Sequence, residues 1–286
     1  MSLSPKILNG AYDLHVHVAP DAVPRAQSAL SLAEAAQRAG MAGIGIKDHL
    51  CSTVGRCHVL NESFPDGPRF YSSLVLNPSV GGLNPIAVES ALRAGCDIIY
   101  FPTFGAGHQL DVQGANGMPF PLPQGFRGIR LKEWHSEVDQ ILEAVATHEA
   151  ILATGHLSSE ESLWLLNRAK ALGVHRMVVT HASEPVPGMT IEDQRACVSK
   201  GAFIEHCFMA CTQCCSPPVS LDELARQIRS VGVEHVVLSS DFGQVTNGPP
   251  VAGFLDHLNR LHERGFSEDE LRQMIVTNPS RLVGAL

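Results

Sequence analysis

The stretch Tyr12-Asp13-Leu14-His15-Val16-His17-Val18-Ala19-Pro20 decides how this chain is interpreted. Apolar and polar residues alternate in it, as in a β-strand whose successive side chains point to opposite faces. The alternation predicts one apolar and one polar face: Leu14, Val16 and Val18 against Asp13, His15 and His17. Two imidazoles on one strand face can offer neutral nitrogens to a single metal ion. A half-buried strand with two polar residues fits the same letters, so the choice depends on the other strand ends.

Length and composition favour one large α/β domain spanning residues 1–286. The chain has 286 residues, 44% of them hydrophobic, which suits a barrel of typically ~250 residues. The net charge of −8 and the lack of a long basic run argue against a nucleic-acid partner. The chain has no run of 18 or more apolar residues, so no membrane span is expected. Met1 to Gly10 lacks the apolar core of a signal peptide. We therefore expect a cytoplasmic protein that acts on a small molecule.

Eight apolar runs, typical of buried strands, alternate with segments typical of helices. The predicted strands are 12–20, 41–49, 70–77, 97–103, 150–155, 176–180, 202–206 and 235–240. The predicted helices are 31–40, 54–63, 85–95, 136–149, 158–173, 191–201, 220–232, 252–265 and 267–276. Such alternation implies parallel strands and right-handed crossovers. It predicts a (β/α)8 TIM barrel with an inserted loop or hairpin at 105–135, after strand four, and a C-terminal helical cap at 266–286.

Polar residues with metal-binding chemistry stand where these apolar runs end. They are His15, His17, Lys47, His49, His156, His181, Glu205 and Asp241. Barrel active sites lie at the C-terminal ends of the strands, so we expect these side chains to converge. Four histidines and an aspartate suit one or two divalent ions, Zn²⁺ or another such as Mn²⁺, Fe²⁺ or Ni²⁺. A bound ion lowers the pKa of a water from 15.7 to about 7, and Asp241 is the candidate general base.

The pattern His15-x-His17, His156, His181 and Asp241 resembles the amidohydrolase superfamily of metal-dependent hydrolases, over nearly the whole chain. The resemblance implies that His15, His17 and Asp241 hold one metal. It implies that His156 and His181 hold a second or complete a single site. Members with two metals commonly have a bridging carbamylated Lys, or a Glu, at the end of strand four. Here that strand ends Tyr100-Phe101-Pro102-Thr103-Phe104, so Lys47, His49 and Glu205 are further candidate ligands.

The resemblance implies hydrolysis of a C–N or C–O bond, as in an amide, a cyclic amide or imide, or a lactone. The same scaffold also serves non-oxidative decarboxylases. The start of the chain is similar to PHP-type phosphoesterases through His15-x-His17 and Asp48-His49. That family has a seven-stranded barrel and ends in Asp-x-His, whereas here Asp241-Phe242-Gly243 lacks the second His. A non-catalytic metal-binding protein is the remaining alternative.

Four of the eight cysteines cluster late in the chain: Cys207, Cys211, Cys214 and Cys215. The first three have the spacing C-x3-C-x2-C, which resembles the iron–sulfur motif of radical SAM enzymes. In those enzymes the motif belongs near the start of the barrel, and here it comes late. A structural zinc is also possible. We expect reduced thiols in a loop.

The substrate pocket is less legible than the metal ligands. Arg25 and Arg130 are candidates to bind a substrate carboxylate through a bidentate fork, and Asn77 and His108 lie near strand ends. Gly243, next to Asp241, suits close approach of the backbone to a ligand. Leu163, Trp164, Leu165 and Leu166 give one helix apolar residues on more than one face, which predicts a homo-oligomer.

Overall fold

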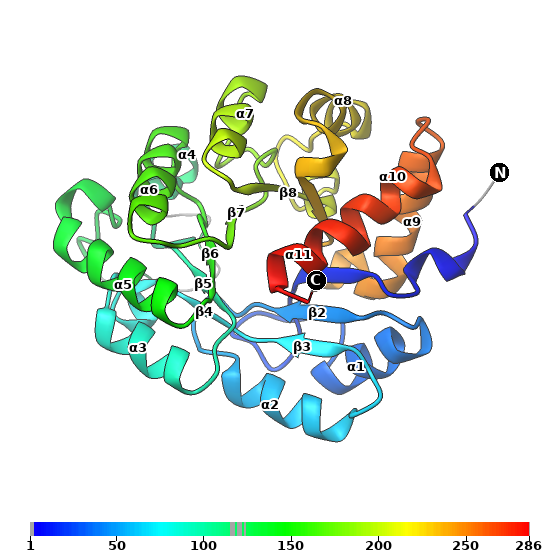
Figure 1. The fold of residues 1–286 in the computed structure, drawn as a ribbon, viewed down its shortest axis with the longest axis horizontal. Helices are drawn as coiled ribbons and strands as arrows, with labels where there is room; N and C mark the ends of the chain where they lie inside the picture. Colours follow the sequence, from blue (N-terminus) through cyan, green and yellow to red (C-terminus); the bar gives the residue numbers. More distant parts are fainter. Residues whose placement is uncertain (1–2, 115–117, 119–121, 123, 286) are drawn as a thin grey trace.

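The computed structural model describes residues 3–114, 118, 122 and 124–285. Parallel strands form a ring at the centre of the molecule, and helices surround it (Figure 1). The strands are β1 (Tyr12–Val16), β2 (Gly43–Ile46), β3 (Arg69–Tyr71), β4 (Ser73–Val75), β5 (Ile98–Tyr100), β6 (Ile151–Ala153), β7 (Met177–Val179), β8 (Phe203–Cys207) and β9 (Val236–Ser239). Each lies within or within one residue of a predicted strand.

The nine strand segments occupy eight positions in the barrel, because β3 and β4 are two parts of one strand interrupted at Ser72. β3 pairs with β2 and β4 pairs with β5, so the interruption divides the hydrogen-bonded ladder into a three-stranded and a six-stranded part. At the other seam, Asp241 N–H donates to the carbonyl of His15 (2.9 Å) and His17 N–H donates to the carbonyl of Phe242 (2.8 Å). The predicted TIM barrel is confirmed, and the eight strand positions disfavour a seven-stranded PHP barrel.

The helices alternate with the strands and cover the outside of the ring (Figure 1). They are α1 (Ala29–Arg38), α2 (Val54–Ser63), α3 (Pro85–Arg93), α4 (Gly107–Gln113), α5 (His135–Thr147), α6 (Ser159–Ala171), α7 (Ile191–Ser199), α8 (Leu221–Val231), α9 (Pro250–His262), α10 (Glu268–Arg272) and α11 (Asn278–Val283). Side-chain caps fix several starts: Asn84 accepts from the first turn of α3, and Ser158 and Ser220 do so for α6 and α8.

An extra residue in β1 alters the predicted faces of that strand. Asp13 is opposite Ile44, but Val16 is opposite Ile46, so three steps on β1 match two on β2. This is a β-bulge, which breaks the alternation of side chains. Leu14 therefore packs in the barrel interior, while Asp13 accepts a hydrogen bond from Ser240 N–H at 2.9 Å. The prediction that Leu14 shares a face with Val16, and Asp13 with His15, was wrong.

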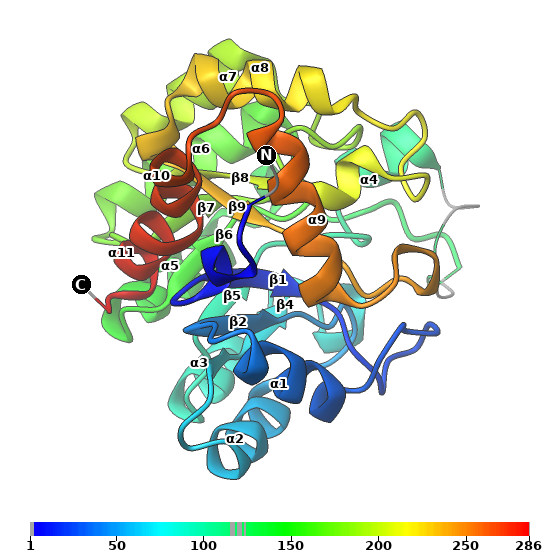
Figure 2. The same cartoon turned by 90° about the vertical axis from the view of Figure 1, so that its right-hand side faces the viewer.

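The two ends of the barrel differ (Figure 2). At the N-terminal end of the strands, Leu282 and Val283 of α11 pack against the interior side chains and close the barrel. α10 and α11 are joined by a π-helical turn, Gln273–Thr277, and form the predicted cap. At the opposite end lies the insertion, where α4 replaces the predicted loop or hairpin. Part of the insertion lies outside the described residues.

Within the part of the chain that the structure describes, no helix has the length and apolarity needed to cross a membrane. The apolar run of α6 is largely used inside the chain. Leu165 and Leu166 are fully buried, and Leu163 and Trp164 are half-buried against the core. The homo-oligomer therefore stays a prediction, which light scattering at micromolar concentration would test.

Candidate metal centre

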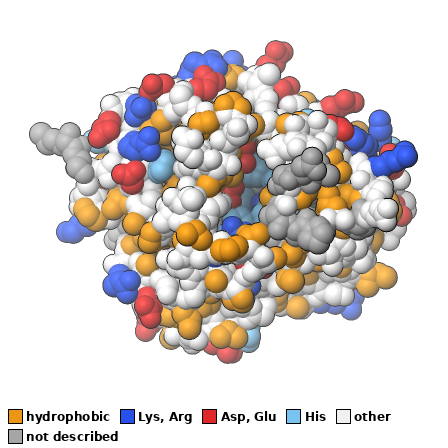
Figure 3. Space-filling view, turned by 180° about the vertical axis from the view of Figure 1, so that it is seen from behind, with side chains coloured by type: hydrophobic (Ala, Val, Ile, Leu, Met, Phe, Trp, Pro, Cys, Tyr) orange, Lys and Arg blue, Asp and Glu red, His pale blue; other side chains and the backbone are white. Residues whose placement is uncertain are grey.

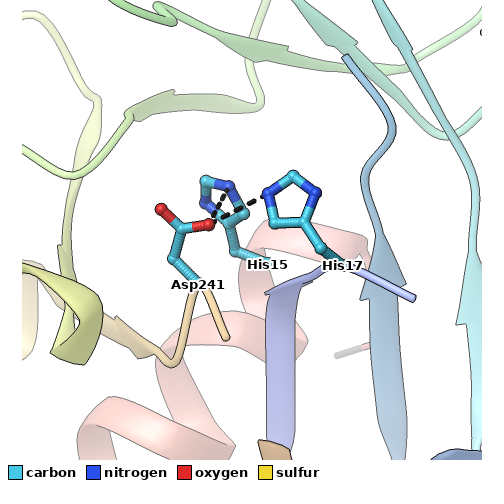
Figure 4. A group of neighbouring side chains, drawn as sticks. All are labelled: His15, His17 and Asp241. Carbon is cyan, nitrogen blue, oxygen red and sulfur yellow. Dashed lines mark ion pairs between the residues drawn. The ribbon is translucent and has the colours of Figure 1, made fainter. Parts of the chain in front are cut away.

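The seam between β1 and β9 brings His15, His17 and Asp241 together at the C-terminal end of the barrel (Figure 4). Asp241 Oδ1 lies 3.2 Å from His15 Nε2 and 3.0 Å from His17 Nε2. All three side chains are almost fully buried. The second oxygen of Asp241 points away from both imidazoles (Figure 4).

Two further side chains hold the imidazole of His15. Glu205, on β8, places Oε2 3.0 Å from His15 Nδ1, so that this nitrogen donates its proton to the carboxylate. Lys47, just after β2, donates to His15 Nε2 at 3.0 Å and lies over the ring of Tyr100. The lone pair of Nε2 therefore faces Asp241 and Lys47. A carboxylate behind a histidine is the usual arrangement that orients a metal ligand.

His17 has a different partner behind it. The guanidinium of Arg25 donates to His17 Nδ1 at 3.3 Å and also pairs with Asp21 at 2.7 Å. Arg25 lines the mouth of the barrel, as predicted for a substrate-binding residue, but these two contacts already engage its guanidinium. Because Arg25 can only donate, His17 Nδ1 accepts, and its Nε2–H faces Asp241.

The other predicted histidines continue around the mouth from His17. His49 stacks on His17 with ring centroids 4.9 Å apart, and its Nδ1 accepts from the hydroxyl of Thr103. His156 follows β6, and its Nδ1 lies 2.6 Å from Oε1 of Gln109 on α4. His181 follows β7, with its ring centroid 4.7 Å from that of His156.

Sequence reasoning missed Glu184, which lies three residues after His181. Its side chain is 6% exposed, and Oε2 lies 3.8 Å from His181 Nδ1. The signal in the sequence was Thr180-His181-Ala182-Ser183-Glu184, a carboxylate close behind a strand-end histidine. Gln109 of α4 was missed as well, because the insertion gave no periodic pattern.

Burial keeps the imidazoles of the mouth neutral. It lowers the pKa of His17 to about 4, against the opposing effect of Asp241. Burial, with the charge of Lys47, lowers the pKa of His181 to about 3. The pKa values of His49 and His156 lie well below the ordinary value for the same reason, reinforced by Lys47 and the neighbouring imidazoles. Neutral imidazole is the form that binds metals.

The three carboxylates of the mouth behave differently from one another. Burial acts to raise the pKa of Asp241, but the charges and hydrogen bonds of His15 and His17 outweigh it and hold the pKa well below the ordinary value. Burial likewise opposes the contacts of Glu205 with His15, which lower the pKa of Glu205 to about 2. For Glu184, burial and the charge of Asp241 raise the pKa well above its ordinary value.

The backbone is strained at two of these residues. His181 has φ 32° and Asp241 has φ 51°, in the left-handed region that residues other than Gly rarely occupy. Such strain is concentrated at functional sites. Gly243, with φ 145°, is required for another reason: a Cβ there would lie 2.2 Å from the carbonyl of His17. Gly243 thus makes room for the backbone of β1 rather than for a ligand.

Several of the side chains of the candidate site line a cavity of about 380 Å³ at the barrel mouth. Figure 3 looks into this mouth, where histidine and acidic side chains lie in a central hollow. The catalytic and ligand candidates on its wall are His17, Lys47, His49, His156, Glu184 and Asp241. Phe104, Met209 and Val245 supply apolar surface. The cavity is large enough for a small molecule.

Three of the predicted substrate-binding residues do not line this cavity. Asn77 is fully buried, and its amide bonds to Thr103, Gly105 and the carbonyl of His49, so it fixes loops. His108 and Arg130 line a separate cavity of about 320 Å³ beside α4 and α6, where Arg130 pairs with Asp111. Their role in substrate binding stays a prediction, but they lie away from the cavity at the metal ligands, because loop paths are not encoded in the strand pattern.

Of the four clustered cysteines, Cys207 ends β8 and the other three lie in the segment that follows it. Cys207 lies in the barrel interior with its Sγ 3.7 Å from His15 Nδ1, and Cys215 contacts the sulfur of Met209. Cys214 is exposed and lines the mouth. Among the described residues, the groups able to hold an ion do not include Cys207, Cys211 and Cys214 together.

The donors at the β1–β9 seam fit a divalent ion. Atoms bound to one ion at about 2.1 Å lie roughly 3.0–3.4 Å apart at octahedral or tetrahedral angles. The distances from Asp241 Oδ1 to His15 Nε2 and to His17 Nε2, 3.2 and 3.0 Å, fall in this range. Two imidazoles and a carboxylate suit zinc and the neighbouring transition metals.

The structure resembles solved hydrolases over almost the full chain. An amidohydrolase from Pseudomonas aeruginosa matches with a TM-score of 0.65 and 13% identity, covering 98% of each chain. The probable dipeptidase PvdM from the same species has a TM-score of 0.67 and 12% identity, covering 98% of this chain and 96% of that chain. A TatD homologue from Escherichia coli has a TM-score of 0.62 and 16% identity, covering 96% and 98%.

These similarities show that the chain shares its TIM-barrel fold with these proteins. A comparison of the sequence with curated proteins gives no match. A family model matches residues 10–205, from the first strand through β7 to Glu205 on β8. The chain therefore belongs to DUF6282, a family of unknown function.

Proposed function

We propose that this protein is a metal-dependent hydrolase that cleaves a C–N or C–O bond of a small molecule. The observation that carries the proposal is the convergence of His15, His17 and Asp241 beside an open cavity, which His17 and Asp241 line. A bound divalent ion would supply a water of lowered pKa and polarise a carbonyl of the substrate.

The residues of the chain divide the remaining work. His15 and His17 hold the ion, with Glu205 fixing the imidazole of His15. Asp241 is the candidate general base, because it is buried, ionised and at the centre of the ligand group. Lys47, His156 and His49 lie on the cavity wall, where they can bind the substrate. The cavity itself argues against a purely structural metal, which would not need an open mouth.

The test combines metal analysis with an activity screen. The metal content of the purified protein is measured by mass spectrometry, and amides, lactones and phosphoesters are screened as substrates. We expect His15→Ala to lose metal and turnover together. His58→Ala, on the exposed face of α2, is the matched control and should keep both. Turnover without metal would refute the proposal, as would a metal whose loss only lowers thermal stability.

A further inference from the structure

A second group of side chains on the other side of Asp241 has the chemistry of a metal site. His181, Glu184 and Asp241 place one potential ligand atom each within 4.8 Å of one another. His181 Nδ1 and Glu184 Oε2 are 3.8 Å apart. Two atoms bound to one ion at about 2.1 Å lie between roughly 3.0 and 4.2 Å apart, so this distance fits a shared ion.

Two atoms of this group are buried without a partner. His181 Nδ1 and Glu184 Oε1 make no hydrogen bond, although His181 is 1% and Glu184 6% exposed. Leaving a buried polar atom unsatisfied typically costs about 1–3 kcal/mol, so a partner is expected for each. A divalent cation can serve both atoms, because a neutral imidazole nitrogen and a carboxylate oxygen are both metal ligands.

Charge points the same way. The mouth buries three carboxylates, Glu184, Glu205 and Asp241. Arg25 and Lys47 are the Arg and Lys side chains among the described residues that line the mouth. Arg25 is paired with Asp21, and Lys47 forms no ion pair within 4 Å with a described residue, so neither is paired with one of these carboxylates. Burying like charges next to each other is costly unless a proton or cation lies between them. His181 and Asp241, two members of this group, also have positive φ values, which residues other than Gly rarely adopt.

The strand-five histidine does not join this group. The resemblance to the amidohydrolase superfamily implies that His156 and His181 share an ion. Here His156 belongs to none of the potential ligand groups among the described residues, whereas Glu184 does. Glu184 stands in the place that His156 was expected to take.

We propose that His181, Glu184 and Asp241 form a second divalent-cation site, with Asp241 bridging the two ions through its two carboxylate oxygens. The proposal rests on the proposed function, because the first ion is held by His15, His17 and Asp241. Figure 4 shows the arrangement that permits the bridge: one oxygen of Asp241 faces the two imidazoles and the other points away. An aspartate would then do what the absent strand-four Lys or Glu does in other barrels of this type.

The experiment counts ions rather than turnover. Protein stripped with a chelator is loaded with Mn²⁺, and bound metal is measured by mass spectrometry after desalting. We expect two ions per chain in the wild type and a coupled two-ion spectrum in electron paramagnetic resonance. Glu184→Gln should retain one ion and show an uncoupled spectrum. His17→Ala should also retain one ion, in this case the ion held by His181 and Glu184.

Two variants act as controls. Glu62→Gln, at an exposed position of α2, should keep two coupled ions. His156→Ala should also keep two, which separates Glu184 from the strand-five histidine as the ligand. Two ions in Glu184→Gln, or the loss of one in His156→Ala, would overturn the proposal. A single ion in the wild type, removed by His17→Ala, would overturn it while the proposed function stands. No bound ion in the wild type would refute both.

Discussion

The two sides of the barrel mouth are built in different ways. At the β1–β9 seam, both nitrogens of His15 and of His17 have partners, supplied by Glu205, Lys47, Asp241 and Arg25. On the side of β7, His181 Nδ1 and Glu184 Oε1 are buried without a partner. The polar atoms of the seam are therefore satisfied by the protein alone, whereas two buried atoms of the β7 side find no partner among the described residues.

The difference shows how one fold can prepare two sites to different degrees. The ligands of the seam are positioned by backbone hydrogen bonds between β1 and the residues after β9. An ion there requires Lys47 to leave His15 Nε2 and the proton of His17 to move from Nε2 to Nδ1. On the β7 side, the buried atoms without a hydrogen-bond partner and the positive φ of His181 lower the stability of the folded protein. Strain of this kind persists only where the surrounding structure enforces it.

The largest expected effect follows from Asp241, which belongs to both sides. Asp241→Asn keeps a side-chain oxygen that can coordinate the ion, but the neutral amide cannot act as a general base. We expect much of the metal to remain, with kcat reduced by ~10²–10⁴-fold, the usual cost of losing a general base. Steady-state kinetics with the best substrate from the screen, together with metal analysis, checks this. Wild-type turnover with metal bound would show that the base is another residue, to be sought at Glu205, His49 or Lys47.

The next effect concerns the preparation of the seam. Glu205→Gln removes the charge that orients His15 while keeping the shape of the side chain. Loss of such an outer partner typically weakens metal binding by ~10–100-fold, so we expect a rise in Kd of that size. Competition with a coloured chelator measures it, with Glu62→Gln as the control. An unchanged Kd would mean that packing alone holds the imidazole of His15.

A smaller effect, of opposite sign, is expected at His17. When Nε2 binds an ion, Nδ1 must carry the proton, and it then faces Arg25, which is itself a donor. In Arg25→Gln the amide oxygen of the new side chain can accept a hydrogen bond from that N–H, so we expect metal binding to tighten by up to about tenfold. Chelator competition again gives the Kd, and Arg38→Gln on the surface of α1 is the control. Weaker binding would mean that Arg25 supports the site through its pair with Asp21.

The sequence predicts the seam better than the β7 side for a physical reason. Parallel strands end at one rim, so apolar runs that stop at His15, Lys47, His181 and Asp241 are enough to place these residues together. Glu184 follows no such rule, because it lies in a loop whose path depends on contacts made elsewhere. The position of His108 and Arg130 at another cavity could not be predicted for the same reason, because it depends on the path of the insertion that contains α4.

The bulge in β1 shows a second limit. Alternation along one strand predicts which residues share a face only when the register with the neighbouring strand is regular. The extra residue between Asp13 and Val16 is visible only in the pairing with β2. It leaves His15 in the interior and moves Asp13 to Ser240, where burial raises the pKa of Asp13 to about 7.

The smallest expected effect concerns the pH dependence of stability in metal-free protein, which should differ between Glu205 at the seam and Glu184 on the β7 side. The pKa of Glu205 is lowered to about 2 in the folded state, from an ordinary 4.5, by contacts with His15 that overcome burial. Its stabilisation is thus present above about pH 4.5 and is lost as the pH falls toward 2. The pKa of Glu184 is raised by burial and by Asp241, so Glu184 costs stability as the pH rises above 4.5.

At pH 8, Glu205→Gln should lower the free energy of unfolding by about 1–3 kcal/mol, and Glu184→Gln should raise it by on the order of 1 kcal/mol. Urea unfolding with a chelator present, at pH 5 and pH 8, measures both differences. The gain from Glu184→Gln should shrink at pH 5, and a gain that is absent at pH 8 would mean that the β7 side is satisfied without a ligand.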